Sequence, residues 1–355
     1  MTLPTRMQGA MLLGPSHIEI RDVDVATPGP HEMLVKMRAA TTCGTDVKVY
    51  KRGGHPRMLT VPTLFGHEMA GQVAAVGTNV TQFVPGERVV IANSAACGTC
   101  RYCVCERENL CESLAYLNGA FAEYIRVPAR FVARSVYRLP AELAFERAAL
   151  SEPLACVLHG LSACHVDRYR RMPDAQAVVY GAGPIGLLFV AALARAGLEV
   201  IVADPNPSRI ACAKRMGATH GVHIQRGGEQ AERVRVATHE ERGAAVVIEC
   251  TGMPEVWNDA IATAEVGGLV NLFGGCAPGT EVALDTHRLH YSEITLKGVY
   301  HHRPETFVEA IDMLSDPTFP ADELLSSRMP ISRVSQALQQ MIEKQALKVV
   351  ITNDS

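Results

Sequence analysis

The spacing of apolar and polar residues divides the chain into two regions with different rhythms. In the first region, short runs of alternating apolar and polar residues are separated by turns such as Pro28-Gly29-Pro30 and Pro85-Gly86. This alternation is typical of strands that bury one face. We therefore expect a β-rich, barrel-like antiparallel domain, whose strands include His17–Val25, Met33–Ala39, Ala70–Val76 and Arg88–Ala92.

From Ala177 onward, apolar runs of strand length alternate with segments of helical length. Pro184 and Pro207 stand where a first helical turn tolerates proline, and Gly197 and Gly217 stand where a helix would end. This alternation predicts an α/β domain with a parallel, doubly wound sheet. The expected strands are Ala177–Tyr180, Glu199–Ala203, Val246–Glu249, Leu269–Phe273 and an edge strand at Ile294–Tyr300; the expected helices are Pro184–Ala196, Pro207–Met216 and Pro254–Ala264.

The segment from Arg303 to Ser355 predicts two further helices and a final strand, at Pro304–Leu314, Ser332–Lys344 and Leu347–Thr352. A chain of 355 residues is long enough for two domains of ordinary size. Its content of 48% hydrophobic and 20% charged residues is typical of a soluble globular protein. The formal net charge of −3 and the lack of a basic patch argue against a nucleic-acid partner.

The eleven cysteines do not indicate a secreted, disulfide-bonded protein. A chain of this size has enough core material without cross-links, and its cysteines cluster at metal-ligand spacing. The residues from Met1 to Gly14 contain no sustained apolar run, and the twenty uncharged residues between Asp174 and Arg195 are interrupted by glycine and proline. We therefore expect a cytoplasmic protein with no membrane partner.

Four cysteines in one short window indicate a closed metal site. Their gaps are two, two and seven residues, so three thiolates can fold round one tetrahedral ion and the fourth can complete the shell. This spacing predicts a structural zinc site formed by Cys97, Cys100, Cys103 and Cys111. Cys105 is an extra thiol in the same window, either a bystander or an alternative ligand.

A dinucleotide fingerprint follows the predicted strand that ends at Tyr180. Gly181 permits a tight turn, Gly183 lets the backbone approach a pyrophosphate, and Gly186 lets the helix pack close to the sheet. The helix N-terminus then offers unpaired N–H groups to the phosphates. Asp204, at the end of the next strand, can bind both ribose hydroxyls of NAD and repel a 2′-phosphate, so we favour NAD over NADP.

A second set of metal-binding side chains is dispersed along the first region. Cys43 lies in Cys43-Gly44-Thr45-Asp46, His67 and Glu68 lie in Gly66-His67-Glu68, and Glu152 follows Ser151. A catalytic zinc takes about three protein ligands and keeps one position open. Cys43, His67 and either carboxylate could supply that set, although each residue alone is weak evidence.

Taken together, these motifs resemble the zinc-dependent medium-chain dehydrogenase/reductase family, and within it the sorbitol (L-iditol 2-) and polyol dehydrogenase branch. The resemblance covers essentially the whole chain. It implies a GroES-like catalytic domain at residues 1–153 and 301–355, with the zinc lobe near residues 93–112, and a Rossmann NAD-binding domain at residues 154–300. The motifs that carry it are Cys43–Asp46, Gly66–Glu68, the four-cysteine lobe, Gly119–Tyr124, Ser151–Leu154 and Gly181–Gly186.

The resemblance implies roles for individual residues. Cys43, His67 and Glu68 match the catalytic zinc positions, and Glu152 matches a carboxylate that binds the metal or stands just behind it. Thr45 matches the hydroxyl that takes the substrate proton, and Asp46 matches the partner that orients the histidine. The implied cofactor-binding residues are Gly181, Gly183, Pro184, Ile185, Gly186, Asp204, Arg209, Thr251, Gly252, Phe273, Gly274 and Lys348, the last as a cation for the pyrophosphate.

One departure concerns the proton relay. Lys48 occupies a position where relatives often carry a histidine. Its side chain either carries the proton with a lowered pKa, leaves the relay to water and the ribose hydroxyl, or is a surface charge.

The expected function is a zinc-dependent, NAD-linked oxidoreductase that interconverts a secondary alcohol of polyol, sugar or cyclitol type with its ketone, by zinc-alkoxide formation and hydride transfer. The resemblance implies two Zn²⁺ ions per chain, one catalytic and one structural, and a homodimer or homotetramer. One alternative is an L-threonine 3-dehydrogenase-like enzyme, which shares the Cys-Gly-Thr-Asp element. Another is a non-catalytic NAD-binding scaffold, which intact metal ligands argue against.

Overall fold

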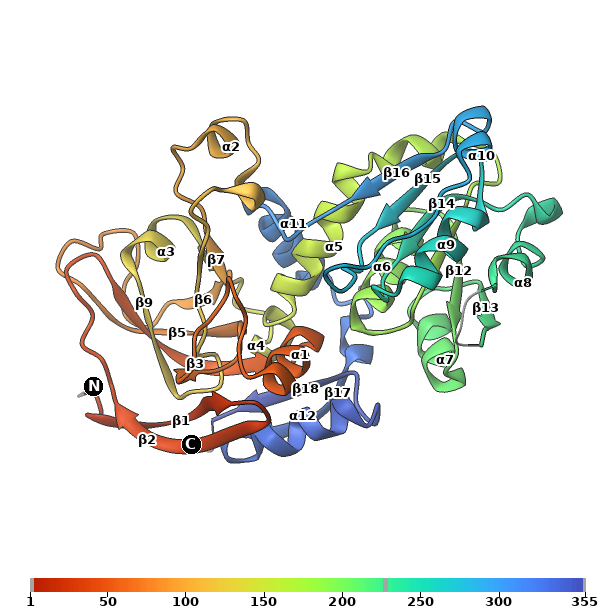
Figure 1. Cartoon of the computed structure of the whole chain (residues 1–355). Coiled ribbons are helices and arrows are strands. Elements are labelled where there is room, and N and C mark those ends of the chain that lie inside the picture. The colour runs from red at the N-terminus through yellow and green to blue at the C-terminus, as the bar shows by residue number, and fades with distance from the viewer. Residues whose placement is uncertain (1–2, 226–228, 354–355) are drawn as a thin grey trace. The chain divides into compact units, whose positions relative to one another are not determined.

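The computed structural model describes residues 3–225 and 229–353, which fall into two units (Figure 1). Unit 1 comprises Met1–Ala155, Arg303–Pro317 and Leu324–Ser355, and unit 2 comprises Cys156–His302 and Thr318–Glu323. The chain passes from one unit to the other four times, and two of these points lie within α5 (Ser151–Ala163) and η4 (Ala321–Leu324).

Unit 1 is built round a largely antiparallel sheet. Its strands are β3 (Met33–Thr41), β5 (Glu68–Val76), β6 (Arg88–Ile91), β9 (Tyr124–Val127), β10 (Val136–Arg138), β17 (Leu325–Pro330) and β18 (Lys348–Thr352). Within the described residues their order is β10-β6-β5-β3-β18-β17, with β9 also paired to β3, and only β17 and β18 run parallel. The prediction of an antiparallel, β-rich first region is confirmed.

Smaller sheets and short helices complete unit 1. The remaining strands are β1 (Arg6–Gly14), β2 (His17–Asp24), β4 (Thr63–Leu64), β7 (Ser94–Ala95) and β8 (Ala115–Tyr116). Strand β1, which we did not predict, pairs with both β2 and β4. The helices are α1 (Gly44–Arg52), α2 (Arg101–Val104), η1 (Glu108–Leu110), α3 (Ala129–Arg134), α4 (Phe145–Ala148), α11 (Pro304–Ser315), η5 (Ile331–Arg333) and α12 (Val334–Ile342).

Unit 2 contains the predicted parallel sheet. Its strands are β11 (Gln176–Tyr180), β12 (Glu199–Asp204), β13 (His220–His223), β14 (Ala244–Glu249), β15 (Ala264–Leu272) and β16 (Thr295–Gly298). Among the described residues these six strands are all parallel, in the order β13-β12-β11-β14-β15-β16. The chain order reverses direction between β11 and β14, and the crevice at such a point is where doubly wound sheets bind ligands.

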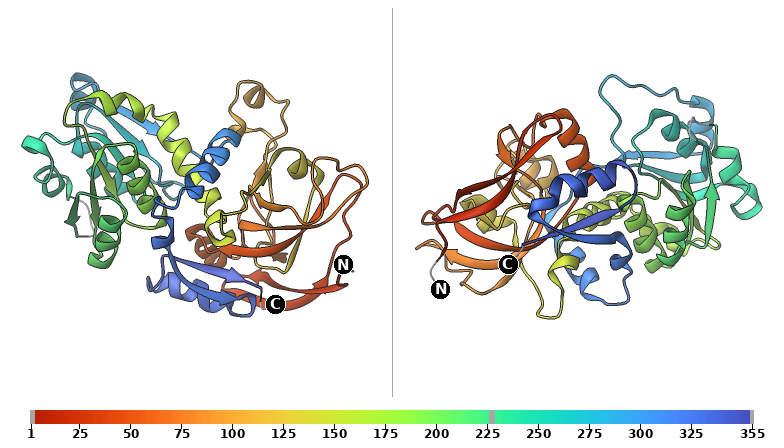
Figure 2. Two further views of the ribbon diagram at one scale, coloured as in Figure 1. Left: turned by 180° about the vertical axis from the view of Figure 1, so that it is seen from behind. Right: turned by 90° about the horizontal axis from the view of Figure 1, so that it is seen from below.

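Helices lie on both faces of this sheet (Figures 1 and 2). Because both faces are covered, every residue of β11 and β14 is buried. By contrast, no residue of the edge strands β13 and β16 is fully buried. The helices of unit 2 are η2 (Val166–Arg171), α6 (Pro184–Arg195), α7 (Pro207–Arg215), α8 (Ala231–Arg235), η3 (His239–Glu241), α9 (Pro254–Thr263) and α10 (Thr286–Tyr291).

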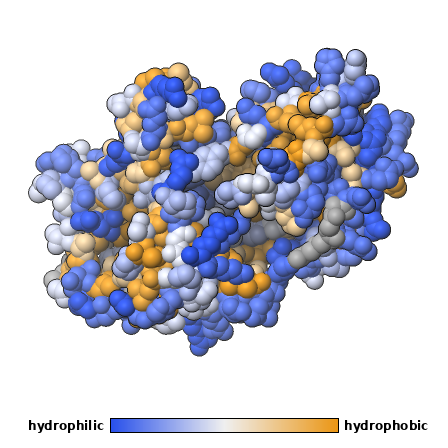
Figure 3. All heavy atoms as spheres, viewed as in Figure 1, coloured by the Kyte–Doolittle hydropathy of each residue, from blue (hydrophilic) through white to orange (hydrophobic). Residues whose placement is uncertain are grey.

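Each unit has its own apolar core. In unit 1 that core includes Leu12, Met33 and Phe121, and in unit 2 it includes Val178 and Ile201, all 0% exposed. In the view of Figure 3, hydrophilic residues cover most of the visible surface, with apolar residues scattered among them. No helix within the described residues combines the length and the apolar character needed to cross a membrane.

Candidate metal centres and cofactor site

The sheet of unit 1 brings the dispersed metal-binding residues together. In the ladder between β3 and β5, Thr41 pairs with Glu68, and in the ladder between β3 and β18, Thr41 pairs with Val350. Cys43 follows the end of β3, and His67 precedes the start of β5. Residues far apart in the chain therefore meet at one end of three adjacent strands.

Local structure fixes the two ends of this arrangement. Cys43 is the N-cap of α1: its thiol accepts a hydrogen bond from Thr45 N–H at 3.4 Å, and its own N–H donates to Asp46 Oδ2 at 2.9 Å. Gly66 has a φ of +89°, and a Cβ there would lie 2.8 Å from the Phe121 ring. Only glycine fits at the residue that turns the chain into His67.

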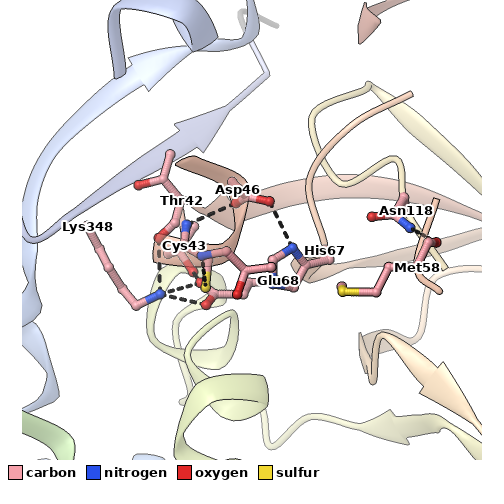
Figure 4. Close-up of polar contacts among 10 residues, drawn as sticks. Thr42, Cys43, Asp46, Met58, His67, Glu68, Asn118 and Lys348 are labelled. Atoms are coloured by element: carbon pink, nitrogen blue, oxygen red, sulfur yellow. Dashed lines mark hydrogen bonds and ion pairs between the residues drawn. The ribbon is translucent and has the colours of Figure 1, made fainter. Parts of the chain in front are cut away.

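Asp46 orients His67 (Figure 4). The Nδ1 atom of His67 lies 2.9 Å from Asp46 Oδ1, and both side chains are buried, at 4% and 1% exposure. Burial alone would lower the pKa of His67, but the charge and hydrogen bond of Asp46, together with the Cys43 thiol, raise it well above its ordinary value. Because Nδ1 is held by Asp46, Nε2 is the ring nitrogen left for a metal ion.

Lys348 and Glu68 form a fully buried ion pair. The Nζ atom lies 2.6 Å from Glu68 Oε1 and 2.5 Å from Oε2, and it donates to the carbonyl oxygen of Thr42 at 3.1 Å. Thr41 Oγ1 donates a further, very short hydrogen bond to Glu68 Oε2. Although burial lowers the pKa of Lys348, the charge of Glu68 raises it above its ordinary value.

This placement corrects the expected role of Lys348. We predicted that its side chain would reach the pyrophosphate of a cofactor. An ammonium group has three N–H donors, and here they have three acceptors, all within unit 1. The side chain is 1% exposed, so it has neither a free donor nor a path to a ligand in this structure.

Glu152 lies in the first turn of α5 and is 7% exposed. Burial raises the pKa of its carboxyl to about 7; Glu68 and Asp46 add to this rise, and His67 and Lys348 oppose it. Because the charges of His67 and Glu68 act on its carboxyl, Glu152 is a neighbour of the metal-binding group. The carboxylate that groups with Cys43 and His67 is Glu68 rather than Glu152.

The donor set fits a zinc ion. One ligand atom each from Cys43, His67 and Glu68 lies within 4.8 Å of the others. A sulfur, an imidazole nitrogen and a carboxylate oxygen are the donors that zinc prefers, and three protein ligands with an open position are typical of a catalytic site. Thr45 is half-buried on α1 beside Cys43, whereas Lys48 is exposed on the same helix, which fits a surface charge.

The four predicted cysteines of the zinc lobe also come together, in a group of their own. Their sulfur atoms are 3.5 Å apart for Cys100 and Cys103, 3.9 Å for Cys97 and Cys103, and 3.9 Å for Cys100 and Cys111. Four thiolates at about 2.3 Å from one zinc ion lie about 3.8 Å from each other, so the spacing fits a tetrahedral ion. Cys105 is exposed and outside the group.

Backbone donors prepare this lobe for a metal. The N–H groups of Thr99 and Cys100 donate to Cys97 Sγ at 3.5 and 3.3 Å, and these bonds lower the pKa of Cys97 to about 5. Burial raises the pKa of Cys103 to about 12. A bound ion would remove this difference between the pKa values of Cys97 and Cys103, because it would hold all four sulfurs as thiolates. This lobe is the structural zinc site, and the Cys43–His67–Glu68 group is the catalytic one.

The glycine turn of unit 2 has the shape that a dinucleotide requires. Gly181 has a φ of +94°, and a Cβ on Gly186 would lie 1.8 Å from the carbonyl oxygen of Gly181. By contrast, a Cβ on Gly183 would meet nothing within 4 Å, so the backbone there borders open space. Pro184 is the first residue of α6, whose N-terminus offers its N–H groups to that space.

Other predicted cofactor residues gather at the same edge of the sheet. Asp204 Oδ2 accepts a hydrogen bond from Ala182 N–H at 2.7 Å, and Oδ1 accepts one from Asn206 N–H at 2.8 Å, which leaves each oxygen able to accept another. Arg209 lies in the first turn of α7. Thr251 and Gly252 follow β14, and Phe273 and Gly274 follow β15.

Sequence reasoning missed several side chains around these sites. Figure 4 also draws Met58 and Asn118, and Asn118 Nδ2 donates to the carbonyl oxygen of Met58 at 3.0 Å. Neither residue belongs to a metal-binding motif, and their place follows from the folding of two loops. Glu249 is buried at the end of β14, where the run of apolar residues that precedes it was the only available signal.

Two family models match the chain. The alcohol dehydrogenase GroES-like domain matches residues 29–140, and the zinc-binding dehydrogenase model matches residues 184–316. The first match contains Cys43, His67 and the four-cysteine lobe, and the second begins at the first residue of α6.

Known proteins resemble the chain over nearly its whole length. It is 30% identical to a sorbitol dehydrogenase of Bacillus subtilis, over 99% of this chain and 98% of that protein. It is 32% identical to an L-threonine 3-dehydrogenase of an Anaeromyxobacter species, over 94% of each. A solved structure assigned as a zinc-binding dehydrogenase of Sinorhizobium meliloti, bound to NADP, has a TM-score of 0.88 at 28% identity and covers 98% of this chain and 100% of that one.

Proposed function

Because the chain belongs to the zinc-dependent medium-chain dehydrogenase/reductase family, we propose that it interconverts a secondary alcohol of polyol, sugar or cyclitol type with its ketone, using NAD. Membership itself makes the protein a zinc-dependent, NAD(P)-linked alcohol dehydrogenase that acts on CH–OH groups. The proposal adds the substrate class and the choice of cofactor. The observation that carries it is the grouping of Cys43, His67 and Glu68, with His67 oriented by Asp46.

Each residue of the site has a definite task in this mechanism. Cys43, His67 and Glu68 would hold the zinc ion, which would supply Lewis-acid polarisation of the alcohol oxygen, and a nicotinamide dinucleotide would supply the hydride acceptor. Asp46 fixes the ring of His67 through Nδ1. Thr45 Oγ1 receives the proton of the alcohol and passes it toward solvent.

Two carboxylates in one buried region favour a substrate with several hydroxyl groups. Glu68 and Glu152 are both buried and sense each other's charge, since Glu68 contributes to the raised pKa of Glu152. Carboxylates accept hydrogen bonds from hydroxyl donors, and a polyol brings more than one such donor.

Asp204 supports NAD as the preferred cofactor. Its carboxylate stands at the end of β12, beside the glycine turn, where it can accept hydrogen bonds from both hydroxyl groups of an adenosine ribose. A 2′-phosphate at the same place would meet a negative charge. The Sinorhizobium protein binds NADP, so the preference of this chain rests on its own residues.

An amino-alcohol substrate is the second candidate, and the 32% identity to an L-threonine 3-dehydrogenase favours it. The two buried carboxylates would accept hydrogen bonds from an ammonium group as readily as from hydroxyl groups. The two candidate substrates differ in whether they carry an ammonium group. A survey of substrates separates them directly.

The test is a dehydrogenase assay with NAD and with NADP across polyols, sugars, cyclitols, L-threonine and simple primary alcohols. We expect the highest kcat/KM with NAD and a vicinal diol. Cys43→Ala should abolish activity and lower the zinc content from about two ions per chain to about one, and Cys105→Ala, at an exposed cysteine, should change neither. A preference for L-threonine selects the second candidate, and a preference for ethanol rejects both. Activity that survives Cys43→Ala would remove Cys43 from the chemistry.

A further inference from the structure

One buried carboxylate in unit 2 has no task in the mechanism above. Glu249 is the last residue of β14 and is 0% exposed. Its register partner in β11 is Tyr180, the residue before the glycine turn. Burial raises the pKa of Glu249, and hydrogen bonds from Thr251 and Gly252 oppose that rise. A carboxylate at this depth is costly unless donors surround it, so its partners show what it stabilises.

The partners of Glu249 come from two loops at the carboxyl edge of the sheet. Its side-chain Oε1 accepts hydrogen bonds from Thr251 N–H at 2.6 Å, from Thr251 Oγ1, and from Gly252 N–H at 3.1 Å, and Oε2 lies 3.2 Å from Gly252 N. Its backbone carbonyl oxygen accepts from Phe273 N–H at 3.1 Å and Gly274 N–H at 2.9 Å. Glu249 thus bonds the loop after β14 through its carboxylate and the loop after β15 through its backbone carbonyl oxygen.

These two loops pack against each other without spare space. A Cβ on Gly252 would lie 2.5 Å from the carbonyl oxygen of Gly275, and a Cβ on Gly274 would lie 2.3 Å from Gly252 N and 2.6 Å from Glu249 Oε2. Trp257 holds the same loop from α9, because its Nε1 donates to the carbonyl oxygen of Gly274 at 3.0 Å.

The loop after β14 also abuts the glycine turn. A Cβ on Gly181 would lie 2.9 Å from Thr251 Cγ2. The backbone that faces the open space at Gly183 is therefore packed against the loop that Glu249 holds. A shift of Thr251 would be transmitted to the turn, because packed side chains leave no void to absorb it.

We propose that Glu249 is a positioning residue for the dinucleotide: its carboxylate fixes the loop at residues 251–252, which packs against the loop at residues 273–275 and against the glycine turn, so that the cofactor meets one preformed surface. The inference rests on the proposed function in taking a nicotinamide dinucleotide as the ligand. Glu249 contacts protein groups and acts through them. Its contribution is preorganisation, which improves affinity by removing the cost of ordering the loops on binding.

The chain carries its own reporter for this proposal. Trp257 is the one tryptophan in the sequence, and its indole is bonded to the loop in question. Bound NADH quenches nearby tryptophan emission, so a titration with NADH measures the dissociation constant directly. Glu249→Gln keeps the size of the side chain but replaces one acceptor oxygen by an NH₂ group that faces N–H donors. We expect the NADH dissociation constant to rise about tenfold to a hundredfold, and kcat at saturating NAD to change less than about threefold.

Asp259→Asn is the matched control. Asp259 is a buried carboxylate on α9 of the same unit, and its Oδ1 accepts a hydrogen bond at 2.9 Å from the N–H of Gln230, a residue that belongs to neither loop. Its substitution should leave the NADH dissociation constant unchanged. If Glu249→Gln does not fold, Thr251→Val replaces it: this variant removes one donor to Glu249 and keeps the side-chain volume, and it should weaken NADH binding by several fold.

The outcomes separate the two proposals. If NADH does not quench Trp257 emission or bind by calorimetry in the unmodified protein, the cofactor assignment itself is wrong. If the unmodified protein binds NADH and Glu249→Gln, or Thr251→Val in its place, binds equally well, Glu249 does not position the loops. Equal weakening by the control Asp259→Asn would also overturn the inference, because the effect would then be a general loss of structure.

Discussion

The ammonium group of Lys348 lies 2.6 Å from Glu68 Oε1, in an ion pair where neither side chain is more than 1% exposed. The pair joins the first residue of β5 to the first residue of β18. Glu68 therefore reaches the metal centre with its charge already balanced. This balance limits the negative charge of the metal-binding group, because the carboxylate of Glu68 shares its buried region with one fixed cation.

Removing the cation should destabilise unit 1. We expect Lys348→Met to lower the free energy of unfolding by about 3–5 kcal/mol, because it leaves the charge of Glu68 buried without a partner. Urea denaturation of the variant measures the change. The double variant Lys348→Met/Glu68→Gln should recover most of the loss, and Lys48→Met, at an exposed lysine, should change stability by less than about 0.5 kcal/mol. Full stability in Lys348→Met would contradict an important role for the pair.

Asp46 should tune the catalytic zinc rather than the structural one. Asp46→Asn keeps a hydrogen-bond acceptor near His67 but removes the charge, so we expect the affinity of the catalytic site for zinc to fall about tenfold to a hundredfold. Competition with a chromogenic chelator measures this affinity. The zinc held by the four cysteines is the internal control and should be released at an unchanged concentration of chelator.

The cysteine lobe should lose its ion when one ligand is changed. Cys100→Ser should reduce the zinc content by about one ion per chain and lower the temperature of thermal unfolding, because metal binding stabilises the folded lobe. Cys105→Ser changes a thiol that is exposed and outside the cluster, so it should retain all of its zinc. A loss of zinc in Cys105→Ser instead would mean that the ligand set is different.

Asp204 should decide between the two dinucleotides. Asp204→Ser removes the charged acceptor at the end of β12, and a hydrogen bond to a charged group contributes about 1.5–3 kcal/mol. We therefore expect kcat/KM with NAD to fall about tenfold to a hundredfold, while kcat/KM with NADP stays constant or rises. An equal fall of kcat/KM with NAD and with NADP would indicate damage to the glycine turn, because Asp204 also accepts a hydrogen bond from Ala182 N–H.

Tyr137 should make the protein less stable in alkali. Its ring stacks on Phe307 with centroids 4.8 Å apart, and burial raises the pKa of Tyr137 to about 12, with smaller contributions from Glu305 and Glu108. An unfolded tyrosine titrates near pH 10, so the folded state binds the extra proton between about pH 10 and pH 12 and stability falls as pH rises. Between pH 10 and pH 12, the unfolding free energy of Tyr137→Phe should fall by about 2–3 kcal/mol less than that of the unmodified protein. Measurement of the unfolding free energy of both proteins from pH 8 to pH 12 provides the comparison.

The sequence predicted best where a pattern is local. The fully buried strands β11 and β14 read as continuous apolar runs, and the cysteine lobe is specified within fifteen residues, Cys97 to Cys111. Edge strand β13 was missed because it has four residues, with two exposed histidines at its ends. Helix α1 was missed because Cys43, its N-cap, is not among the residues that usually mark a helix start.

The candidate site was harder to predict because its charges depend on distant pairings. Cys43 and His67 were recognised from their motifs, but nothing near Lys348 in the chain indicates that Glu68, 280 residues away, is its partner. The residues after Lys348, Val349-Val350-Ile351, predict a buried strand and would favour an exposed lysine at its start. The ladder between β18 and β3 is what buries the lysine, and such a pairing leaves no local trace.

The order of synthesis gives the Lys348–Glu68 pair a further consequence. A ribosome makes the chain from its N-terminus, so Glu68 is exposed to the cell while Lys348, 280 residues later, does not yet exist. During that interval the carboxylate of Glu68 has no Lys348 to pair with, and its burial without that cation would be costly. The ion pair therefore forms only after β18, the last strand of the chain, has been made.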